Sequence, residues 1–372
     1  MSQTITKPKI LVAMSGGVDS SLAAYLLRGQ GHDIVGVNMR THRLSADEIA
    51  RGAQIKTCCS PTDAKDARAC AEQSDFPFYV LDVETDFKRD VIDPFVASYI
   101  RGETPNPCVL CNNYVKLGLL LEKAELWGCE LVATGHYARK TQFPETGRWA
   151  LQRAADENKD QTYYLFGLKQ EQLAMLSLPL GELTKAEVRE QARAAGIPTA
   201  EKPESQEICF IPDNDYRGFL RRRFEKTGQA VPRGRFLDME GRDLGEHEGI
   251  PFYTVGQRRG LNLYGPEPHY VVKIDAQNNN VIVGPQSAVF STSLIADEIN
   301  WMGLEKLESP QPALVRIRHR HTPAEATLHP LEENKVRVEF AEPQLAVSPG
   351  QAAVFYDEEK RVLGGGWITA KS

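Results

Sequence analysis

Short apolar runs alternate with longer segments of helical periodicity through residues 1–200. Four apolar runs are predicted strands: 9–14, 34–39, 78–83 and 130–134. Four segments carry apolar side chains every three or four positions and are predicted helices: 20–28, 63–73, 87–101 and 114–127. Continuous apolar runs are typical of strands buried on both faces, so this part predicts an α/β domain with a largely parallel sheet.

Local signals mark where this pattern ends. Thr184 followed by Glu187 has the form of a capping box, which predicts a helix that runs to about Gly196. The stretch 199–213 shows no periodicity and is predicted to be a functional loop. From about Val271 onward, Val and Ile alternate with polar residues between turn signals, which predicts a β-rich region and a small C-terminal barrel.

Chain length and pattern together predict three domains. At 372 residues the chain exceeds what one hydrophobic core usually organises. We predict an α/β catalytic domain at 1–214, a small central domain at 215–288 and a β-barrel domain at 289–372. The sequence shows no internal repeat, which excludes solenoid architectures.

Composition narrows the class of protein. The chain is 41% apolar and 25% charged, and no apolar run approaches the roughly 20 residues that span a membrane, so a cytoplasmic globular protein is expected. Seven irregularly spaced cysteines do not resemble a secreted disulfide framework and indicate reactive or metal-binding thiols. The net charge of -6 argues against a uniformly basic nucleic-acid coat. Local basic clusters either bind RNA or form solvated faces: Arg217, Arg221, Arg222, Arg223, Arg316, Arg318, His319, Arg320 and His321.

A glycine and serine loop follows the first predicted strand and leads directly into a predicted helix. Its sequence, from Ser15 to Ser21, is SGGVDSS. Two glycines let the backbone approach an anion closely, and the helix N-terminus supplies unpaired N–H groups and a positive dipole end. The serine hydroxyls add further donors. The strand, loop and helix order therefore predicts a phosphate-binding site.

This loop resembles the pyrophosphatase loop of the N-type ATP pyrophosphatases. It lacks the Gly-Lys-Ser/Thr ending of a P-loop. The resemblance implies that ATP is cleaved between its α- and β-phosphates, that a substrate oxygen is adenylated, and that Mg²⁺, linked through Asp19, balances the charge of pyrophosphate. It also implies which residues line the nucleotide: Ala13, Met14, Ser15, Gly16, Gly17, Val18, Asp19, Ser20, Met39 and Gly135.

Cysteines in two loops indicate the chemistry that follows activation. Cys108 and Cys111 lie three residues apart in a segment that two prolines stiffen, and Cys209 lies in the aperiodic stretch 199–213. A lone cysteine is more often a small buried hydrophobe, which is the interpretation we favour for Cys70 and Cys129. Three thiols that accompany a phosphate loop instead indicate sulfur chemistry.

Further motifs extend the resemblance to the tRNA-specific 2-thiouridylase family, over nearly the whole chain. They occur in the family's order: the phosphate loop, Cys58-Cys59-Ser60, 106–112, 135–139, 159–164, 205–211, 256–260 and 348–352. The resemblance implies an N-terminal parallel-sheet ATP pyrophosphatase domain, a central tRNA-binding domain and a C-terminal β-barrel. We see no chemical role for Cys58 and Cys59.

The family resemblance implies a reaction and its partners. A sulfur-carrier protein or cysteine desulfurase loads a persulfide onto Cys209, ATP adenylates the 2-oxygen of the wobble uridine, and sulfur replaces AMP. Cys111 occupies the nucleophile position, and a disulfide between Cys111 and Cys209 remains. Lysine, glutamate and glutamine tRNAs are the expected substrates, and the protein is expected to be a monomer. The implied tRNA contacts are Asn106, Pro107, Cys108, His136, Lys159, Asp160, Gln161, Arg318, His319 and Gln351.

One position departs from the family pattern. Many relatives carry an aspartate with an acid and base role where this chain has Cys108, and a thiol is a poorer proton carrier. Cys108, Cys111 and Cys209 would supply three thiolates, so we hypothesise that they hold an iron-sulfur cluster with one open iron site. Zinc is disfavoured because a closed structural site normally needs a fourth ligand.

Three other functions share parts of this pattern. A ligase that transfers nitrogen would need an ammonia source, and the sequence shows neither an N-terminal cysteine nor a glutaminase segment. A non-catalytic RNA-binding or iron-sulfur scaffold would not need the intact loop from Ser15 to Ser21. A sulfur donor to a small metabolite would not need the β-rich C-terminal domain.

Overall fold

The computed structural model describes residues 7–41, 61–204, 208–211, 214–265 and 267–371. Its contacts divide the chain into two compact units that each draw on separate stretches of sequence. The first unit comprises residues 1–91, 108–214 and 360–362, and the second comprises 92–107, 215–359 and 363–372. Within the described residues, no helix is long and apolar enough to cross a membrane.

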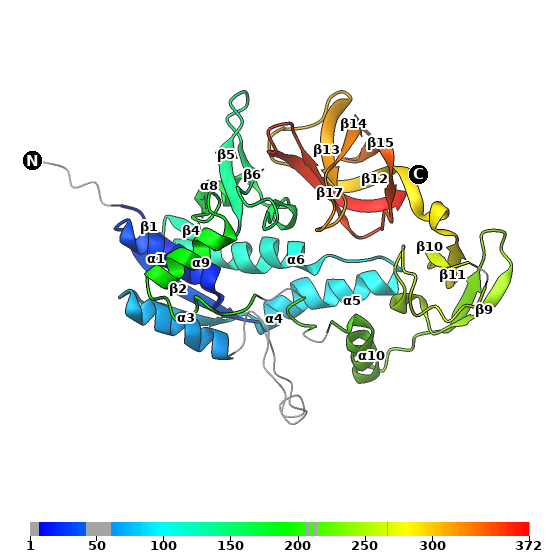
Figure 1. The fold of residues 1–372 in the computed structure, drawn as a ribbon, viewed down its shortest axis with the longest axis horizontal. Coiled ribbons are helices and arrows are strands. Elements are labelled where there is room, and N and C mark those ends of the chain that lie inside the picture. Colours follow the sequence, from blue (N-terminus) through cyan, green and yellow to red (C-terminus); the bar gives the residue numbers. More distant parts are fainter. Residues whose placement is uncertain (1–6, 42–60, 205–207, 212–213, 266, 372) are drawn as a thin grey trace, which may run out of the picture. The chain divides into compact units, whose positions relative to one another are not determined.

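A five-stranded sheet organises the first unit (Figure 1). All of its neighbouring strands are parallel, in the order β3-β2-β1-β4-β7. The strands are β1 (Lys9–Ala13), β2 (Asp33–Arg40), β3 (Phe78–Asp82), β4 (Leu131–Ala133) and β7 (Leu176–Ser177). The four predicted strands and the parallel α/β class are confirmed; the two-residue β7 was not predicted, because a pair so short has no periodicity.

Helices cover this sheet on both faces. One layer contains α1 (Val18–Gly29), α3 (Pro61–Gln73) and α9 (Lys185–Ala194), which share one apolar core with alternate residues of β1. Another helix, α7 (Leu120–Leu126), packs against β1 and β4 and takes no part in that core. Since successive strand residues point to opposite faces, α7 covers the other side of the sheet.

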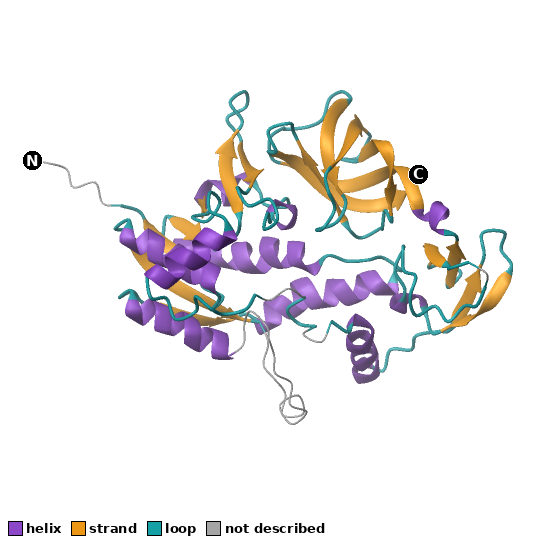
Figure 2. Cartoon of the chain, in the orientation of Figure 1, coloured by secondary structure: helices purple, strands orange, loops and turns teal. Residues whose placement is uncertain are grey.

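Two predicted helices contain wider π-helical turns. Figure 2 draws the helices of the chain in purple. The first runs as α4 (Glu84–Phe87), η1 (Lys88–Ile92) and α5 (Asp93–Ile100). The second runs as α6 (Pro107–Leu110), η2 (Cys111–Leu119) and α7. The predicted helical segments are confirmed, but the periodicity gave no sign of the π turns. Such turns are rare and cluster at functional sites, and here one of them begins at Cys111.

A hairpin and several short helices complete the first unit. The hairpin joins β5 (Ala138–Gln142) to β6 (Trp149–Arg153). Helix α8 (Gln170–Met175) and the 3-10 turn η3 (Thr162–Tyr164) follow it. Our sequence analysis missed the hairpin, because Arg and Lys interrupt the apolar alternation of β5.

In the second unit, α5 packs with α10 (Tyr216–Thr227) and a mixed sheet in the order β10-β11-β8-β9. The strands are β8 (Gly234–Leu237), β9 (Asp243–His247), β10 (Tyr270–Asp275) and β11 (Asn280–Gly284). The 3-10 turns η4 (Ile250–Phe252) and η5 (Gln286–Val289) connect these elements. Strands β8 and β9 lie before the region that we predicted to be β-rich.

A closed six-stranded barrel forms the C-terminal part of this unit. Its order is β12-β15-β14-β13-β16-β17, and pairing of β12 with β17 closes it. The strands are β12 (Phe290–Trp301), β13 (Gln311–Arg316), β14 (Ala324–Pro330), β15 (Val336–Leu345), β16 (Ala352–Tyr356) and β17 (Val362–Lys371). The predicted C-terminal barrel is confirmed.

Candidate active site

The phosphate loop lies where the strand order of the sheet reverses. From β1 the chain proceeds to β2 and β3 on one side, whereas β4 lies on the other side of β1. Parallel sheets bind ligands at the carboxyl ends of their strands at such a switch point, because the two loops diverge there. Of the residues predicted to line a nucleotide, Ala13 ends β1, Met39 lies near the end of β2, and Gly135 follows β4. The topology therefore brings this set to one edge.

Two glycines at this edge have no room for a side chain. Gly16 has a φ of +76°, and a Cβ there would lie 2.2 Å from the carbonyl oxygen of Asp63. A Cβ on Gly135 would lie 2.7 Å from the backbone nitrogen of Ser20, in the first turn of α1. The loop after β4 therefore packs directly on the phosphate loop.

Serine hydroxyls fix the shape of the loop. The backbone N–H of Ser15 donates to Oγ of Ser20 over 3.1 Å, and this hydroxyl donates to the carbonyl oxygen of Gly17 over 3.2 Å. The hydroxyls of Ser15 and Ser20 also lie 3.2 Å apart. Oγ of Ser21 is buried and has no hydrogen-bond partner among the described residues. The side chain of Ser20 therefore orders the loop before any anion binds.

Asp19 lies at the centre of a charged network. Its carboxylate accepts hydrogen bonds from the Tyr137 hydroxyl (2.7 Å) and from Nζ of Lys185 (2.6 and 2.8 Å). Lys185 also pairs with Glu204 over 2.9 Å, and Glu204 pairs with Lys159 over 2.7 Å. Burial alone would raise the pKa of Glu204, but hydrogen bonds from Lys159 and Lys185 outweigh it and lower that pKa. Lys185 therefore bridges the carboxylates of Asp19 and Glu204.

A second lysine touches the loop itself. Nζ of Lys202 donates to the carbonyl oxygen of Gly16 over 2.9 Å and pairs with Asp63 (2.6 Å) and Asp66 (2.5 Å) of α3. Burial alone would lower the pKa of Lys202, but the hydrogen bonds that it donates to the two carboxylates outweigh burial and raise that pKa. Our sequence analysis missed Lys185 and Lys202, and the one signal available was that Lys185 follows the capping residue.

Residues predicted to contact tRNA occupy the loops after β4 and before η3. Nδ1 of His136 lies 2.9 Å from the Thr134 hydroxyl, and burial, reinforced by Lys116, lowers the pKa of His136 to about 3. A neutral ring is therefore present at neutral pH. The side-chain oxygen of Gln161 accepts from the backbone N–H of Tyr137 over 2.9 Å. Gln161 thus positions the tyrosine that contacts Asp19.

Asp160 is buried inside the first unit. Its carboxylate accepts from the Thr162 hydroxyl over 2.9 Å and from Nε of Arg153 over 3.4 Å. These hydrogen bonds hold the chain around η3 in place. The neighbouring Lys159 is half-buried, and its ammonium group reaches Glu204.

The cysteines differ in position and burial. Cys108 is half-buried on α6, Cys111 is buried at the start of η2, and Cys209 is half-buried in the stretch that follows α9. Cys70 and Cys129 are buried, and Cys70 belongs to the core of the sheet, which agrees with the packing roles that we predicted for them. Among the described cysteines, Cys108 and Cys209 are more exposed than the others and are therefore more accessible to another molecule.

The iron-sulfur hypothesis finds no support in the geometry. Among the described residues, no three His, Cys, Asp or Glu side chains converge closely enough to hold a metal ion. Cys108, Cys111 and Cys209 therefore do not form a ligand set here. Cys58 and Cys59 lie outside the described residues.

Predicted RNA contacts in the second unit are partly engaged within the protein. Asn106 and Pro107 are buried, and Nε2 of Gln351 donates to the carbonyl oxygens of Thr104 and Pro105. Arg318 donates to the carbonyl oxygen of Leu345 over 2.8 Å. The carbonyl oxygen of His319 accepts from Arg316.

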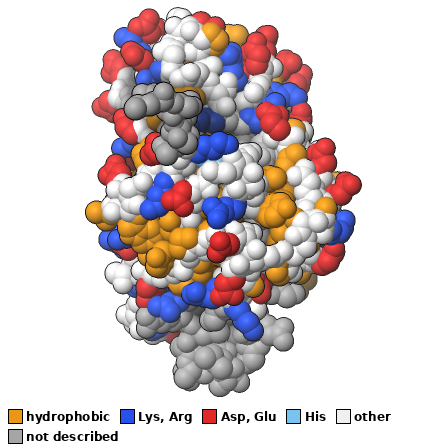
Figure 3. Space-filling model, turned by 90° about the vertical axis from the view of Figure 1, so that its left-hand side faces the viewer, with side chains coloured by type: hydrophobic (Ala, Val, Ile, Leu, Met, Phe, Trp, Pro, Cys, Tyr) orange, Lys and Arg blue, Asp and Glu red, His pale blue; other side chains and the backbone are white. Residues whose placement is uncertain are grey.

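The basic residues of α10 also have partners. Arg221 pairs with Glu248 over 2.5 Å, and Arg223 pairs with Asp93 over 2.6 Å. Charges of both signs are interspersed on the face drawn in Figure 3 as well. These ion pairs offset part of the positive charge of α10.

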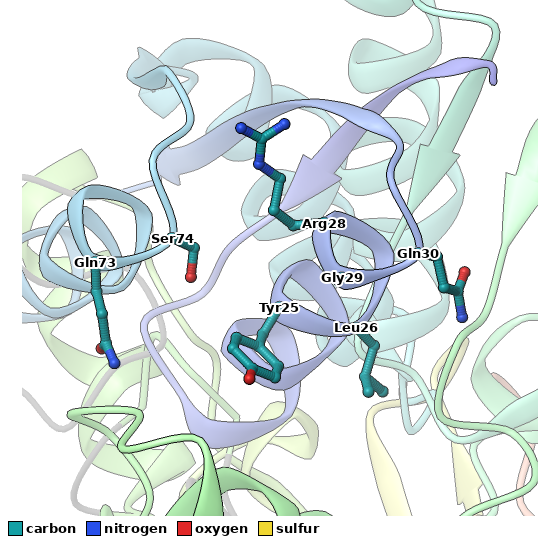
Figure 4. A pocket seen from close by; sticks show the side chains of 7 residues that line it. All are labelled: Tyr25, Leu26, Arg28, Gly29, Gln30, Gln73 and Ser74. Carbon is teal, nitrogen blue, oxygen red and sulfur yellow. The ribbon is translucent and has the colours of Figure 1, made fainter. Parts of the chain in front are cut away.

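An open pocket of about 460 Å³ lies at the far end of α1 from the phosphate loop (Figure 4). Its lining residues are Tyr25, Leu26, Arg28, Gly29, Gln30, Gln73 and Ser74. A helix of 12 residues is about 18 Å long, so this pocket is separate from the loop. Arg28 is its one charged lining residue, and we place no reaction there.

Fold and site together define an ATP-pyrophosphatase-type protein, in which a glycine and serine loop follows the first strand of a parallel sheet. Three family models match the chain, each over one segment. They are described as a tRNA methyl transferase HUP domain (8–213), a tRNA methyl transferase PRC-barrel domain (218–285) and an aminomethyltransferase β-barrel domain (291–368).

Curated relatives match almost end to end, and each of the following is a tRNA-specific 2-thiouridylase MnmA. The protein of Geobacter metallireducens is 49% identical over 367 residues, which is 98% of this chain and 97% of the relative. That of Geotalea uraniireducens is 48% identical and covers 97% and 95%. That of Carboxydothermus hydrogenoformans is 47% identical and covers 98% of both chains. The chain belongs to the tRNA-specific 2-thiouridylase family.

One solved structure shares the fold but superposes only loosely. The U34-tRNA thiolase NcsA of Methanococcus maripaludis, solved with its 4Fe-4S cluster, is 17% identical over 61% of this chain and 74% of that chain, with a TM-score of 0.35. A superposition this loose supports no comparison of individual residues.

Proposed function

We propose that this protein replaces the 2-oxygen of the wobble uridine of tRNA with sulfur at the expense of ATP. The observation that carries the proposal is the preformed phosphate loop at the switch point of the sheet, with Asp19 beside it and thiols in the same unit. Full-length relatives named as tRNA-specific 2-thiouridylases support the choice of substrate.

The first step of the proposed reaction is adenylation. The N–H groups of the loop and of the first turn of α1 would bind the phosphates of ATP, and the 2-oxygen of uridine would attack the α-phosphate. Pyrophosphate would leave towards Lys185 and Lys202, whose ammonium groups already contact Asp19 and the carbonyl oxygen of Gly16. Asp19 is the residue that would hold Mg²⁺, which supplies charge balance for the leaving group. The oxygen of C2 thereby becomes part of a good leaving group, AMP.

Sulfur transfer follows on the activated base. The terminal sulfur of a persulfide on Cys209 would attack C2, and AMP would leave with the former 2-oxygen. Cys111 would then attack the inner sulfur of Cys209, which forms a disulfide and leaves the terminal sulfur on the base. Alternatively, Cys111 first releases that sulfur as sulfide. In either order the two thiols end as a disulfide, so an external reductant must reduce both cysteines before the next turnover.

The substrate and the sulfur donor complete the proposal. We expect lysine, glutamate and glutamine tRNAs as substrates, and a persulfide carrier or a cysteine desulfurase as donor. The base would have to leave its stack for C2 to reach the thiols. We propose two contacts to the base: His136, in the loop after β4, and Cys108, in α6.

Thiolation of unmodified glutamate tRNA tests this proposal. The assay supplies ATP, Mg²⁺ and a persulfide donor, and measures 2-thiouridine by nucleoside mass spectrometry together with AMP. Cys209→Ser and Cys111→Ser should each lower 2-thiouridine by at least about 100-fold, because a hydroxyl carries no transferable sulfur. Cys129→Ala is the matched control, since Cys129 is buried away from solvent and should retain activity.

Other results would contradict particular parts of the proposal. Undiminished product from Cys209→Ser with the persulfide donor would remove Cys209 from the reaction. AMP release that depends on an acceptor other than tRNA would keep the activation step and reject the substrate.

A further inference from the structure

The turn between β15 and β16 holds the segment that leads to the first two thiols. Nε2 of Gln351 donates to the carbonyl oxygen of Thr104 over 2.9 Å and to that of Pro105 over 3.3 Å. In the reverse direction, the N–H of Thr104 donates to the carbonyl oxygen of Pro349 over 2.7 Å. All of these residues belong to the second unit, so the contact lies inside one compact body.

The turn itself is fixed to the barrel. The N–H of Gly350 donates to the carbonyl oxygen of Ile368 on β17 over 2.8 Å, and the N–H of Ile368 donates to that of Gln351 over 2.8 Å. Gly350 has a φ of +87°, and a Cβ there would lie about 3 Å from Glu103 and Thr104. The absence of a side chain lets the two backbones touch. Gln351 therefore reaches Thr104 from a rigid support.

The anchored segment is stiff up to the point where the thiols begin. Pro105 and Pro107 restrict their own φ angles and the backbone of the residue before each. Pro107 is the first residue of α6, Cys108 follows it directly, and Cys111 opens η2. Few rotatable bonds separate the carbonyl oxygens that Gln351 binds from the start of this helix. Where the segment is anchored therefore sets where α6 begins.

The amide of Gln351 has two N–H groups, and two backbone carbonyls receive them. We propose that Gln351 is a positioning residue that fixes the backbone from Thr104 to Pro107, the first residue of α6, and thereby the conformation at the start of the helix that carries Cys108 and Cys111, beyond any contact that it makes with RNA. This inference rests on the proposed function, because that function gives the thiols their chemical role. Its test does not, because thiol reactivity is measured without tRNA or ATP.

Gln351→Glu is the informative substitution. It keeps the length of the side chain, removes both donors, and places a negative charge opposite two carbonyl oxygens. We expect the rates of iodoacetamide labelling at Cys108 and Cys111, followed by peptide mass spectrometry, to change by at least about threefold, the size expected for losing hydrogen bonds of modest strength. In thiolation assays, kcat should fall about tenfold or more, while the tRNA affinity measured by filter binding changes less than about threefold.

Two further variants make the result decisive. Gln351→Met removes the hydrogen bonds without adding charge. It should alter labelling in the same direction as Gln351→Glu, because both variants lose the two hydrogen bonds. Gln286→Glu is the control for charge, because Gln286 is exposed in the same unit. A role confined to RNA contact predicts unchanged labelling in both Gln351 variants with weakened tRNA binding, and this outcome would overturn the inference. Changed labelling without any 2-thiouridine from the wild type would uphold the positioning role and reject the proposed function.

Discussion

Gly135 is the residue whose replacement tests how closely the two loops at the sheet edge must pack. A methyl group there would lie 2.7 Å from the backbone nitrogen of Ser20 and 2.8 Å from the backbone carbon of Asp19. Since neither neighbour is the flexible end of a side chain, the first turn of α1 must move. We expect Gly135→Ala to weaken binding of a non-hydrolysable ATP analogue about tenfold and to cost about 1–3 kcal/mol of stability.

Calorimetric titration and thermal unfolding measure these two effects. Gly29→Ala is the control, because Gly29 lies on α1, the helix that Gly135 contacts, and no atom lies within 4 Å of the added methyl group. It should change stability by less than about 1 kcal/mol. Binding by Gly135→Ala that equals the control would show that the loop has more room than the contacts indicate.

At the residue scale, local sequence predicted the part of the site that is local. Gly16, Asp19 and Ser20 occupy one short run, so strand, loop and helix order was enough to find them. Lys185 lies 166 residues from Asp19, and Lys202 lies 186 residues from Gly16. Their pairing depends on where α9 and the chain after it fold back onto the loop. A single sequence carries no periodic signal for such a contact.

The start of α9 is the element most directly tied to the site. Oγ of Thr184 accepts from the N–H of Glu187 over 3.3 Å, and Glu187 accepts from the N–H of Thr184 over 2.7 Å. Lys185, the partner of Asp19, is the first residue after this cap. Thr184→Ala should therefore cost about 1 kcal/mol and also loosen Lys185, with a several-fold rise in the ATP concentration needed for half-maximal rate.

Denaturant unfolding and ATP kinetics measure the two consequences. Thr184→Ser keeps the hydroxyl that caps the helix and should behave like the wild type. If Thr184→Ala loses stability but retains its response to ATP, then the cap is structural alone and Lys185 is positioned by Asp19 and Glu204.

Elements were predictable where burial on both faces left an uninterrupted apolar run. β1, β2 and β4 met that condition. β3 carries an apolar run although its residues are exposed or half-buried, and the capping box of α9 is present as predicted. The hairpin of β5 and β6 lacked such a run, because its strands mix cations with apolar residues. The π turns were also invisible, since one extra residue per turn shifts helical periodicity too little to detect over nine residues.

At the scale of the whole molecule, the helix α5 joins stretches that are far apart in sequence. Phe95 is fully buried and packs edge-to-face on Phe219 of α10, with ring centroids 6.0 Å apart. Tyr99 stacks on Tyr216 at 5.0 Å and 17°. We expect Phe95→Ala to destabilise the second unit by about 3–5 kcal/mol, because the cavity lies at the junction of α5 and α10.

Hydrogen exchange of α10 and denaturant unfolding check this expectation. Tyr114→Ala is the control, because that ring is 56% exposed and its loss should cost less than about 0.5 kcal/mol. Equal effects of the two substitutions would show that α5 contributes little to the unit.

The grouping of α5 could not be predicted from its position in the chain. We assigned 87–101 to the first domain because it lies between predicted strands of that domain. Contacts group residues 92–107 with the second unit and 360–362 with the first, and the three predicted domain bounds stay a prediction. Such groupings depend on how apolar surfaces of distant segments pack together, whereas periodicity describes one segment at a time.

Closure of the barrel has a consequence for synthesis on the ribosome. β12 pairs with β17, yet about 60 residues separate the end of the one from the start of the other. At about 5–20 residues per second, β12 therefore waits on the order of 3–12 s for its second neighbour. During that time its unpaired edge is open to other growing chains. The nascent barrel thus passes through a period in which chaperone cover matters more than at any point after closure.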